Sequence, residues 1–277
     1  MRLVWNLGLV AAGLATPMAI AIAAFMPGNA LNPTASRVPV PDLVELRPGS
    51  FPYRARGEFT RDGKPARAPV WNVTFTRTLA VMRHQVTEAE YWRCAKAEAC
   101  PMIDRQAAAD DRPMVNVNWH DAQAYAAWLS RETGARFRLP TDVEWAYAAG
   151  GRFVDDALPE AAYGDDPGRR ALAIYDGPSR NRGIDKVSQP VGTFGANERG
   201  LVDLAGNVWE WTDSCFVRAA IEASGDVRAT LVNCGVRVVE GTHRAYVTDF
   251  IRDALKGGCA VGTPPSNLGL RLVRDDR

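Results

Sequence analysis

One short segment, Gly206-Asn-Val-Trp-Glu-Trp211, constrains the fold of this chain more than any other. Two tryptophans directly flank a glutamate, so burying the tryptophans also buries the charge, and a buried carboxylate requires a partner. Two kinds of partner would satisfy the Glu210 carboxylate. A calcium ion would be held by carboxylate oxygens of Asp203 and Glu210 and by the carbonyls of Gly206 and Val208. Alternatively, a buried arginine pairs with Glu210, and the tryptophans are simply core residues.

The N-terminus is predicted to direct export. Arg2 is the only charge before an apolar run from Leu3 to Phe25, and small residues follow as far as Ala30. This order is typical of a signal peptide, but a run of about 23 apolar residues would also span a bilayer as one helix. We therefore expect residues 1–30 to be a signal peptide or a membrane anchor, and the body of the protein to be periplasmic.

Export changes the meaning of the five cysteines, because thiols tend to pair in an oxidising compartment. Proximity along the chain predicts one disulfide between Cys94 and Cys100 and a second between Cys215 and Cys234. Cys259 is left over. A zinc site would compete for these residues, but the chain has no CxxC or HxH motif and only three histidines, which argues against zinc.

The remaining chain has the composition of one folded domain. It has 277 residues, 47% of them hydrophobic, and a net charge of +1 with its basic residues scattered, so no nucleic-acid partner is expected. Residues 31–42 contain three prolines and read as a linker before a domain at 43–277. Residues 151–200 have little periodicity and are expected to be irregular but packed.

Short helices are the clearest predicted elements. The S/T-x-x-E pattern of a capping box begins at Thr87 and again at Thr141. These boxes predict a helix over about 88–97 and another from 142 that ends at the glycines 150–151. The other expected elements are a helix over 119–132 that stops at Gly134, and strands over 71–75 and 237–239. The body is thus predicted to be of the α+β class with much irregular coil.

Five motifs follow one another along the body: Gln85–Trp92, Val117–Tyr125, Arg138–Ala149, Gly206–Trp211 and Ser266–Arg274. In this order they resemble the successive signatures of the formylglycine-generating enzyme (sulfatase-modifying factor) superfamily, over residues 70–274. The resemblance implies the compact fold of that superfamily, distantly related to C-type-lectin-like folds. It also favours the calcium interpretation of Asp203, Gly206, Val208 and Glu210, because the family binds calcium at this motif.

The chain departs from the family at the reactive residues. The enzyme has a Gly-Gly-Ser strand followed by two cysteines, which bind copper and activate oxygen. Here no cysteine occurs from Gly241 to Gly258, and only a thiolate pair gives the soft ligands that hold Cu(I). We therefore expect no copper site of the family type, and Cys259 lies too far along the chain to supply one.

The resemblance also places a substrate groove on this chain. Carried over by position, the groove would be lined by Trp209, Thr242, Asn267 and Arg271. His243 and Glu240 are the catalytic candidates, as a base or a ligand near neutral pH. The alternatives are that His243 is a surface histidine, and that Asn267 and Arg271 brace the C-terminal strand.

Three kinds of function remain open. The export segment, the cysteine pattern and the C-terminal motif look similar to exported proteins encoded beside copper nitrite reductases. This similarity favours an accessory or maturation factor for a periplasmic metalloenzyme, such as nitrite reductase in denitrification. The alternatives are an oxidoreductase-like enzyme that uses another metal or base in the same groove, and a calcium-dependent lectin-like binding module.

Overall fold

The computed structural model describes residues 38–104, 109–156, 169, 172, 187–252 and 267–276. The chain divides into two compact units, Met1–Ala35 and Ser36–Arg277, and all of the described residues belong to the second. The predicted export segment and most of the predicted linker lie outside the described residues, as does Cys259. No helix within the described ranges is long and apolar enough to cross a membrane. The domain boundaries and the export segment stay predictions.

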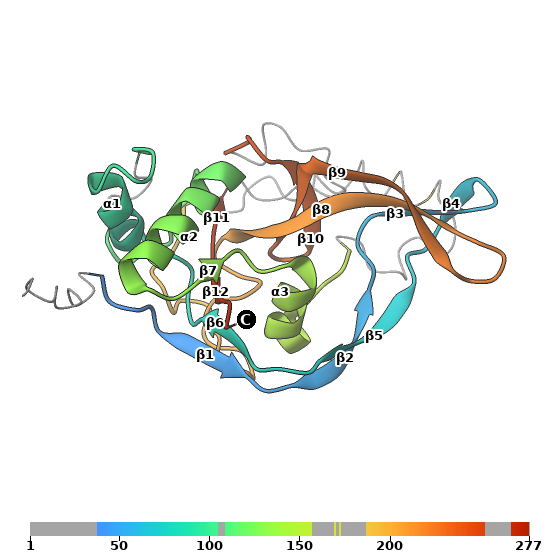
Figure 1. Ribbon diagram of the computed structural model, residues 1–277, viewed down its shortest axis with the longest axis horizontal. Coiled ribbons are helices and arrows are strands. Elements are labelled where there is room, and N and C mark those ends of the chain that lie inside the picture. The colour runs from blue at the N-terminus through green and yellow to red at the C-terminus, as the bar shows by residue number, and fades with distance from the viewer. Residues whose placement is uncertain are drawn as a thin grey trace, which may run out of the picture. The chain divides into compact units, whose positions relative to one another are not determined.

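Three sheets and three α-helices form the described unit (Figure 1). The largest sheet has the order β10-β9-β8-β3-β4, and β11 pairs with β8. A second sheet has the order β1-β6-β12-β7, and β2 pairs with β5 in the third. The strands are β1 Leu43–Leu46, β2 Gly49–Arg54, β3 Glu58–Arg61, β4 Lys64–Ala66, β5 Val70–Phe75, β6 Leu79–Met82, β7 Phe137–Arg138, β8 Trp209–Ile221, β9 Val227–Glu240, β10 Arg244–Thr248, β11 Leu268–Gly269 and β12 Val273–Arg274.

The helices confirm the sequence-based expectations closely. They are α1 Glu88–Lys96, α2 Trp119–Thr133 and α3 Asp142–Ala149. Both predicted capping boxes are present, and the left-handed Gly134 ends α2, where its missing Cβ avoids a steric penalty. A third capping box, Asn118 with Asp121, begins α2 and was not predicted. The α+β class is confirmed.

The strands were predicted less completely. The expected strand at 71–75 is β5, but the expected strand at 237–239 is only the end of β9. β8 and β9 form a long antiparallel hairpin around a turn at Gly225, and it reaches past β3 and β4 in Figure 1. Of residues 151–200, the described parts are irregular apart from a short 3₁₀ turn at Gly150–Arg152 and the helical residues Arg169 and Leu172, and Phe153 packs on the core.

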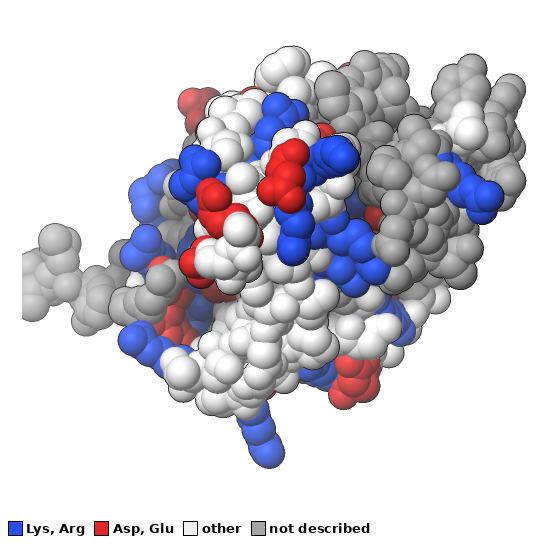
Figure 2. All heavy atoms as spheres, turned by 90° about the vertical axis from the view of Figure 1, so that its right-hand side faces the viewer, with Lys and Arg blue, Asp and Glu red and all other residues white. Residues whose placement is uncertain are grey.

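Charges of both signs are interspersed on the face that includes the far part of this hairpin (Figure 2). Four charged side chains of β3 and the hairpin form two exposed ion pairs, Arg218 with Glu58 at 2.8 Å and Arg228 with Glu222 at 3.0 Å. The main hydrophobic core lies at the other end of the hairpin, where Trp209 and Trp211 pack against α1, α2 and the C-terminal strands. The hairpin therefore runs from the buried core at one end to an exposed turn at the other.

Candidate functional site

Glu210 lies at the centre of a buried polar network. Its side chain is fully buried and pairs with Arg271, whose Nε lies 3.0 Å from Oε2 and whose Nη2 lies 3.0 Å from Oε1. The indole N–H of Trp145 donates to Oε2 at 2.7 Å, and the amide of Gln85 donates to Oε1 at 2.8 Å. Of the two partners that the sequence left open for Glu210, the structure therefore contains the buried arginine.

The proposed calcium ligands do not fit a calcium shell as they lie. Both oxygens of Asp203 accept backbone N–H groups, from Gly192 at 2.6 Å and from Phe194 at 2.8 Å. The charge of Glu210 is neutralised by Arg271, so this carboxylate has no excess charge for a cation. A calcium ion at Asp203, Gly206, Val208 and Glu210 would have to displace these donors. Calcium binding stays a prediction, which calorimetric titration of metal-free protein tests.

Arg271 and Asn267 lie in the interior. Arg271 is fully buried, and each of its three nitrogens donates to a protein acceptor, including the carbonyls of Met82, Arg83 and Val202. The Asn267 residue is 3% exposed, and its carbonyl accepts from the Trp209 backbone N–H. These contacts favour the alternative that both residues brace the C-terminal segment, and neither is exposed to a substrate in this arrangement.

A second buried network contains Glu240. Arg244, the first residue of β10, donates to Asp142 at 3.1 Å and to Glu240 at 3.2 Å, and all three residues are buried. Asp142, the first residue of α3, also accepts from the hydroxyl of Tyr53. Oε2 of Glu240 and Nη2 of Arg244 are buried, and neither has a hydrogen-bond partner among the described residues. Of the members of this cluster, only Glu240 was a site candidate from the sequence.

The two carboxyl groups of this cluster have opposite pKa shifts. Burial, followed by the neighbouring Asp142, raises the pKa of Glu240 well above its usual range. For Asp142, burial acts upward, but Arg244 and hydrogen bonds from Glu240 and Tyr53 lower its pKa overall. The two carboxyl groups share one arginine, so they titrate as a pair, with the upward shift on Glu240. The Glu240 carboxyl is fully buried within the fold and does not face solvent.

His243 lies between this cluster and Trp209. Its ring meets the Trp209 ring edge-on with 4.8 Å between the centroids, and its Nδ1 lies 2.9 Å from the carbonyl of Arg244. Because a carbonyl only accepts, Nδ1 carries the proton, and burial lowers the pKa of the imidazole. Thr242 beside it is exposed. Of the predicted groove residues, the structure thus places His243, with its neighbour Thr242, and Asn267 beside Trp209.

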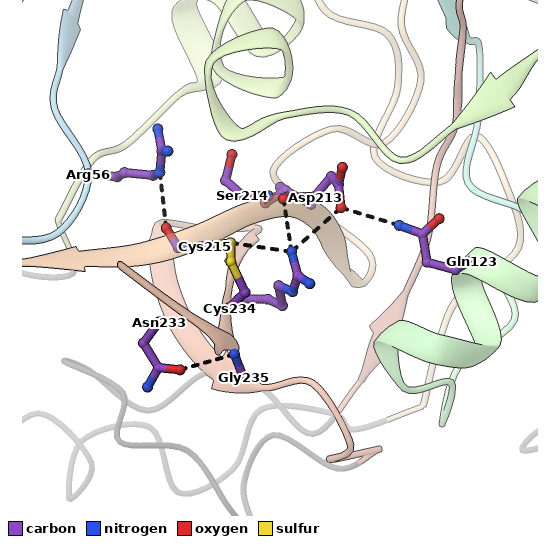
Figure 3. Close-up of a disulfide and its surroundings, with 10 residues drawn as sticks. Arg56, Gln123, Asp213, Ser214, Cys215, Asn233, Cys234 and Gly235 are labelled. Atoms are coloured by element: carbon purple, nitrogen blue, oxygen red, sulfur yellow. Dashed lines mark hydrogen bonds and ion pairs between the residues drawn. A yellow bond between two sulfur atoms is a disulfide. The ribbon is translucent and has the colours of Figure 1, made fainter. Parts of the chain in front are cut away.

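Both predicted disulfides are present. Cys94 bonds to Cys100 in the core, and Cys215 bonds to Cys234 across the β8–β9 hairpin. Figure 3 shows the second bond among polar groups, with Arg56 donating to the carbonyl of Cys215 at 3.1 Å. Within the described ranges, no group of three or more His, Cys, Asp or Glu side chains is arranged to hold a metal ion.

Comparison with known proteins places the chain in a family. A family model described as the sulfatase-modifying factor enzyme 1-like domain matches residues 28–276. The chain belongs to this family. It is 35% identical over 125 residues to the formylglycine-generating enzyme of Thermomonospora curvata, covering 44% of this chain and 38% of the relative. It is 36% identical over 173 residues to the inactive C-alpha-formylglycine-generating enzyme 2 of Bos taurus, covering 56% of this chain and 53% of the relative.

Among solved structures, PvdO from Pseudomonas aeruginosa has the same fold. The TM-score is 0.54 at 24% identity, over 85% of this chain and 94% of PvdO. The expected fold of the formylglycine-generating-enzyme family is thereby confirmed. The chain spans about 38% and 53% of the lengths of the two curated relatives above, so the likeness concerns the shared domain.

Proposed function

We propose that this member of the family is an exported accessory factor that binds a client protein at Thr242 and His243, beside the buried Trp209. The client is a periplasmic metalloenzyme, with copper nitrite reductase as the first candidate. The factor assists maturation of the client and does not oxidise a cysteine, since residues 241–258 contain none.

The observation that carries this proposal is an ion-pair cluster at the start of the segment where the resemblance to the family leads one to expect thiols. The segment that begins at Gly241 enters β10 with Arg244, whose guanidinium is buried against Asp142 and Glu240. An interior filled in this way supports a scaffold role, because every charge in it has an opposite charge beside it. The relative whose name describes it as inactive supports the same interpretation, in that the domain is retained without the family's reaction.

The surface above this cluster supports binding. Trp209 is 1% exposed, yet its indole N–H has no acceptor within the described part of the chain. Beside it lie an imidazole with a lowered pKa and the exposed Thr242. The exposed Thr242 and the half-buried His243, whose ring packs on the buried Trp209, are the polar groups that a polypeptide segment would reach here.

A genetic complementation test with two matched arginine variants examines the proposal. Deleting the gene in its host is expected to lower both the copper content and the activity of periplasmic nitrite reductase. Thr242→Arg places a long charged side chain at the binding surface and should not restore them, whereas Ala97→Arg, an exposed position at the end of α1, should. Unchanged copper content and activity in the deletion strain would exclude nitrite reductase as the client.

A further inference from the structure

The two disulfides of this protein lie in opposite environments. Cys94 and Cys100 are 0% and 7% exposed and belong to the main core cluster. Cys234 is exposed on the outer part of β9, and Cys215 is half-buried on β8. Attack by an external thiolate requires access to a sulfur, so only the Cys215–Cys234 bond is placed for it.

The strand pairing around this disulfide is irregular. Cys215 and Phe216 are adjacent on β8, but their partners on β9 are Arg237 and Asn233, so residues 234–236 of β9 have no opposite residue on β8. A second register shift lies between Trp211 and Cys215. Figure 3 shows Cys234 within this bulge, where Asn233 Oδ1 accepts from the Gly235 N–H at 3.0 Å. Because a bulge leaves ladder bonds unmade, the cysteines can separate while the rest of the hairpin stays paired.

The guanidinium group of Arg237 lies beside Sγ of Cys215, one of the two sulfurs of this disulfide. Nη1 of Arg237 lies 3.5 Å from Sγ of Cys215 and donates at 3.1 Å to the carbonyl of Asp213. The guanidinium carbon lies 3.8 Å from the centre of the Trp119 ring, a cation–π contact that fixes the group in place. A fixed cation beside a sulfur stabilises its thiolate, and a more stable thiolate leaves a disulfide faster.

We propose that Cys215–Cys234 is a thiol–disulfide exchange site that takes dithiols as substrates. One thiolate of the dithiol attacks Sγ of Cys234, the bond between the two cysteines breaks, and Cys215 leaves as a thiolate beside Arg237. In the mixed disulfide, one sulfur belongs to the dithiol and the other to Cys234. The second thiol of the dithiol then attacks the dithiol's own sulfur, and Cys234 leaves as a thiolate. The dithiol loses two electrons and two protons and becomes a disulfide, and the protein gains them as two thiols.

This activity is separate from the proposed accessory function. The exchange site lies on the β8–β9 hairpin and involves none of the residues Trp209, Thr242 and His243. Its test needs no client protein, so either proposal can fail while the other stands.

Differential alkylation measures the exchange directly. The mature protein with Cys259→Ser, which removes the fifth thiol, is treated with dithiothreitol under native conditions. The reaction is quenched with N-ethylmaleimide at intervals, and the labelled cysteines are located by peptide mass spectrometry. Cys215 and Cys234 should be labelled while Cys94 and Cys100 are still unlabelled and the circular dichroism spectrum is still that of the folded protein. Equal rates at both disulfides, or no labelling before unfolding, would overturn the proposal.

Variants of Arg237 test the leaving-group role. Arg237→Gln removes the cation, and a thiolate pKa higher by about one unit slows exchange by about threefold to tenfold. Arg237→Lys keeps the charge and should restore most of the rate. Arg218→Gln removes an arginine from the same hairpin that pairs with Glu58 and touches no sulfur, so it is the matched control. Equal rates for the Arg237→Gln and Arg218→Gln proteins would refute the role of Arg237.

Discussion

Arg271 illustrates how one residue decides between two interpretations of a motif. The sequence required a partner for Glu210, and the structure supplies it from a residue 61 positions away, fully buried and with hydrogen bonds from all three nitrogens. A buried pair of this kind contributes little net stability when intact, because desolvation offsets the attraction. Losing one partner is a different matter, since the remaining charge is left uncompensated.

We therefore expect Arg271→Met to lower the free energy of unfolding by about 3–5 kcal/mol. The measurement is urea denaturation followed by tryptophan fluorescence. Arg228→Met removes an exposed arginine paired with Glu222 and should cost less than about 1 kcal/mol. Adding Glu210→Gln to Arg271→Met removes the stranded charge and should recover part of the loss. A cost for Arg271→Met no larger than for the exposed control would contradict the buried-pair interpretation.

Glu240 gives a prediction about pH. Its pKa is raised in the folded protein, so above pH 4.5, the usual glutamate value, the folded state holds a proton that the unfolded state releases. Stability from this group is present at low pH and is lost as pH rises toward the folded pKa, by at most about 1.4 kcal/mol per pH unit. Glu240→Gln imitates the protonated acid. At pH 5 it should change stability by less than about 1 kcal/mol.

The check is urea denaturation of wild type and Glu240→Gln at several values between pH 5 and pH 8. The stability of the variant relative to wild type should improve as pH rises, because only wild type loses the contribution of a bound proton. The comparison between the two proteins isolates Glu240 from other titrating groups such as His243. A constant difference across this range would show that Glu240 is ionised in the folded protein.

Among the helices and strands, short sequence motifs predicted the helix ends correctly. The capping boxes at Thr87 and Thr141 fixed the starts of α1 and α3, because their hydrogen bonds span only three residues. The β8–β9 hairpin was largely missed, although Ser224-Gly225 offers a turn signal between two runs that contain β-branched residues. Its apolar positions do not alternate cleanly, since the bulge at 234–236 interrupts the period of two.

The N-cap of α3 allows a direct test of these local bonds. Thr141 accepts from the Glu144 backbone N–H, and Glu144 reaches back to Thr141 while also binding Arg138 at 2.6 Å. Thr141→Ala should therefore destabilise the protein by about 1 kcal/mol, measured by thermal or urea unfolding. Thr78→Ala, an exposed position between β5 and β6, is the control and should stay within about 0.5 kcal/mol. Equal effects of the two changes would mean that the cap is not a stabilising feature of α3.

For the whole molecule, family membership and the α+β class followed from ordered motifs, but the partners within the site did not. His243 and Trp209 were predicted to lie at one groove, and in the structure their rings are in contact, with Trp209 buried. The link between Arg244 and Asp142 spans 102 residues, and no spacing rule connects the start of α3 to β10. Long-range ion pairs depend on the tertiary arrangement, so the buried cluster could be found only in the structure.

The C-terminal segment contributes one strand to each of the two larger sheets, so its removal tests the fold as a whole. β12 lies between β6 and β7, β11 pairs with β8, and Arg271 between them neutralises Glu210. Ending the chain after residue 266 removes β11 and β12 and leaves the charge of Glu210 without its partner. This variant should therefore show no cooperative unfolding transition. A chain that begins at Ser36 keeps the whole second unit and should unfold at the same midpoint as the full-length protein. Cooperative unfolding of the C-terminal truncation, measured by circular dichroism, would mean that these strands are not required for the fold.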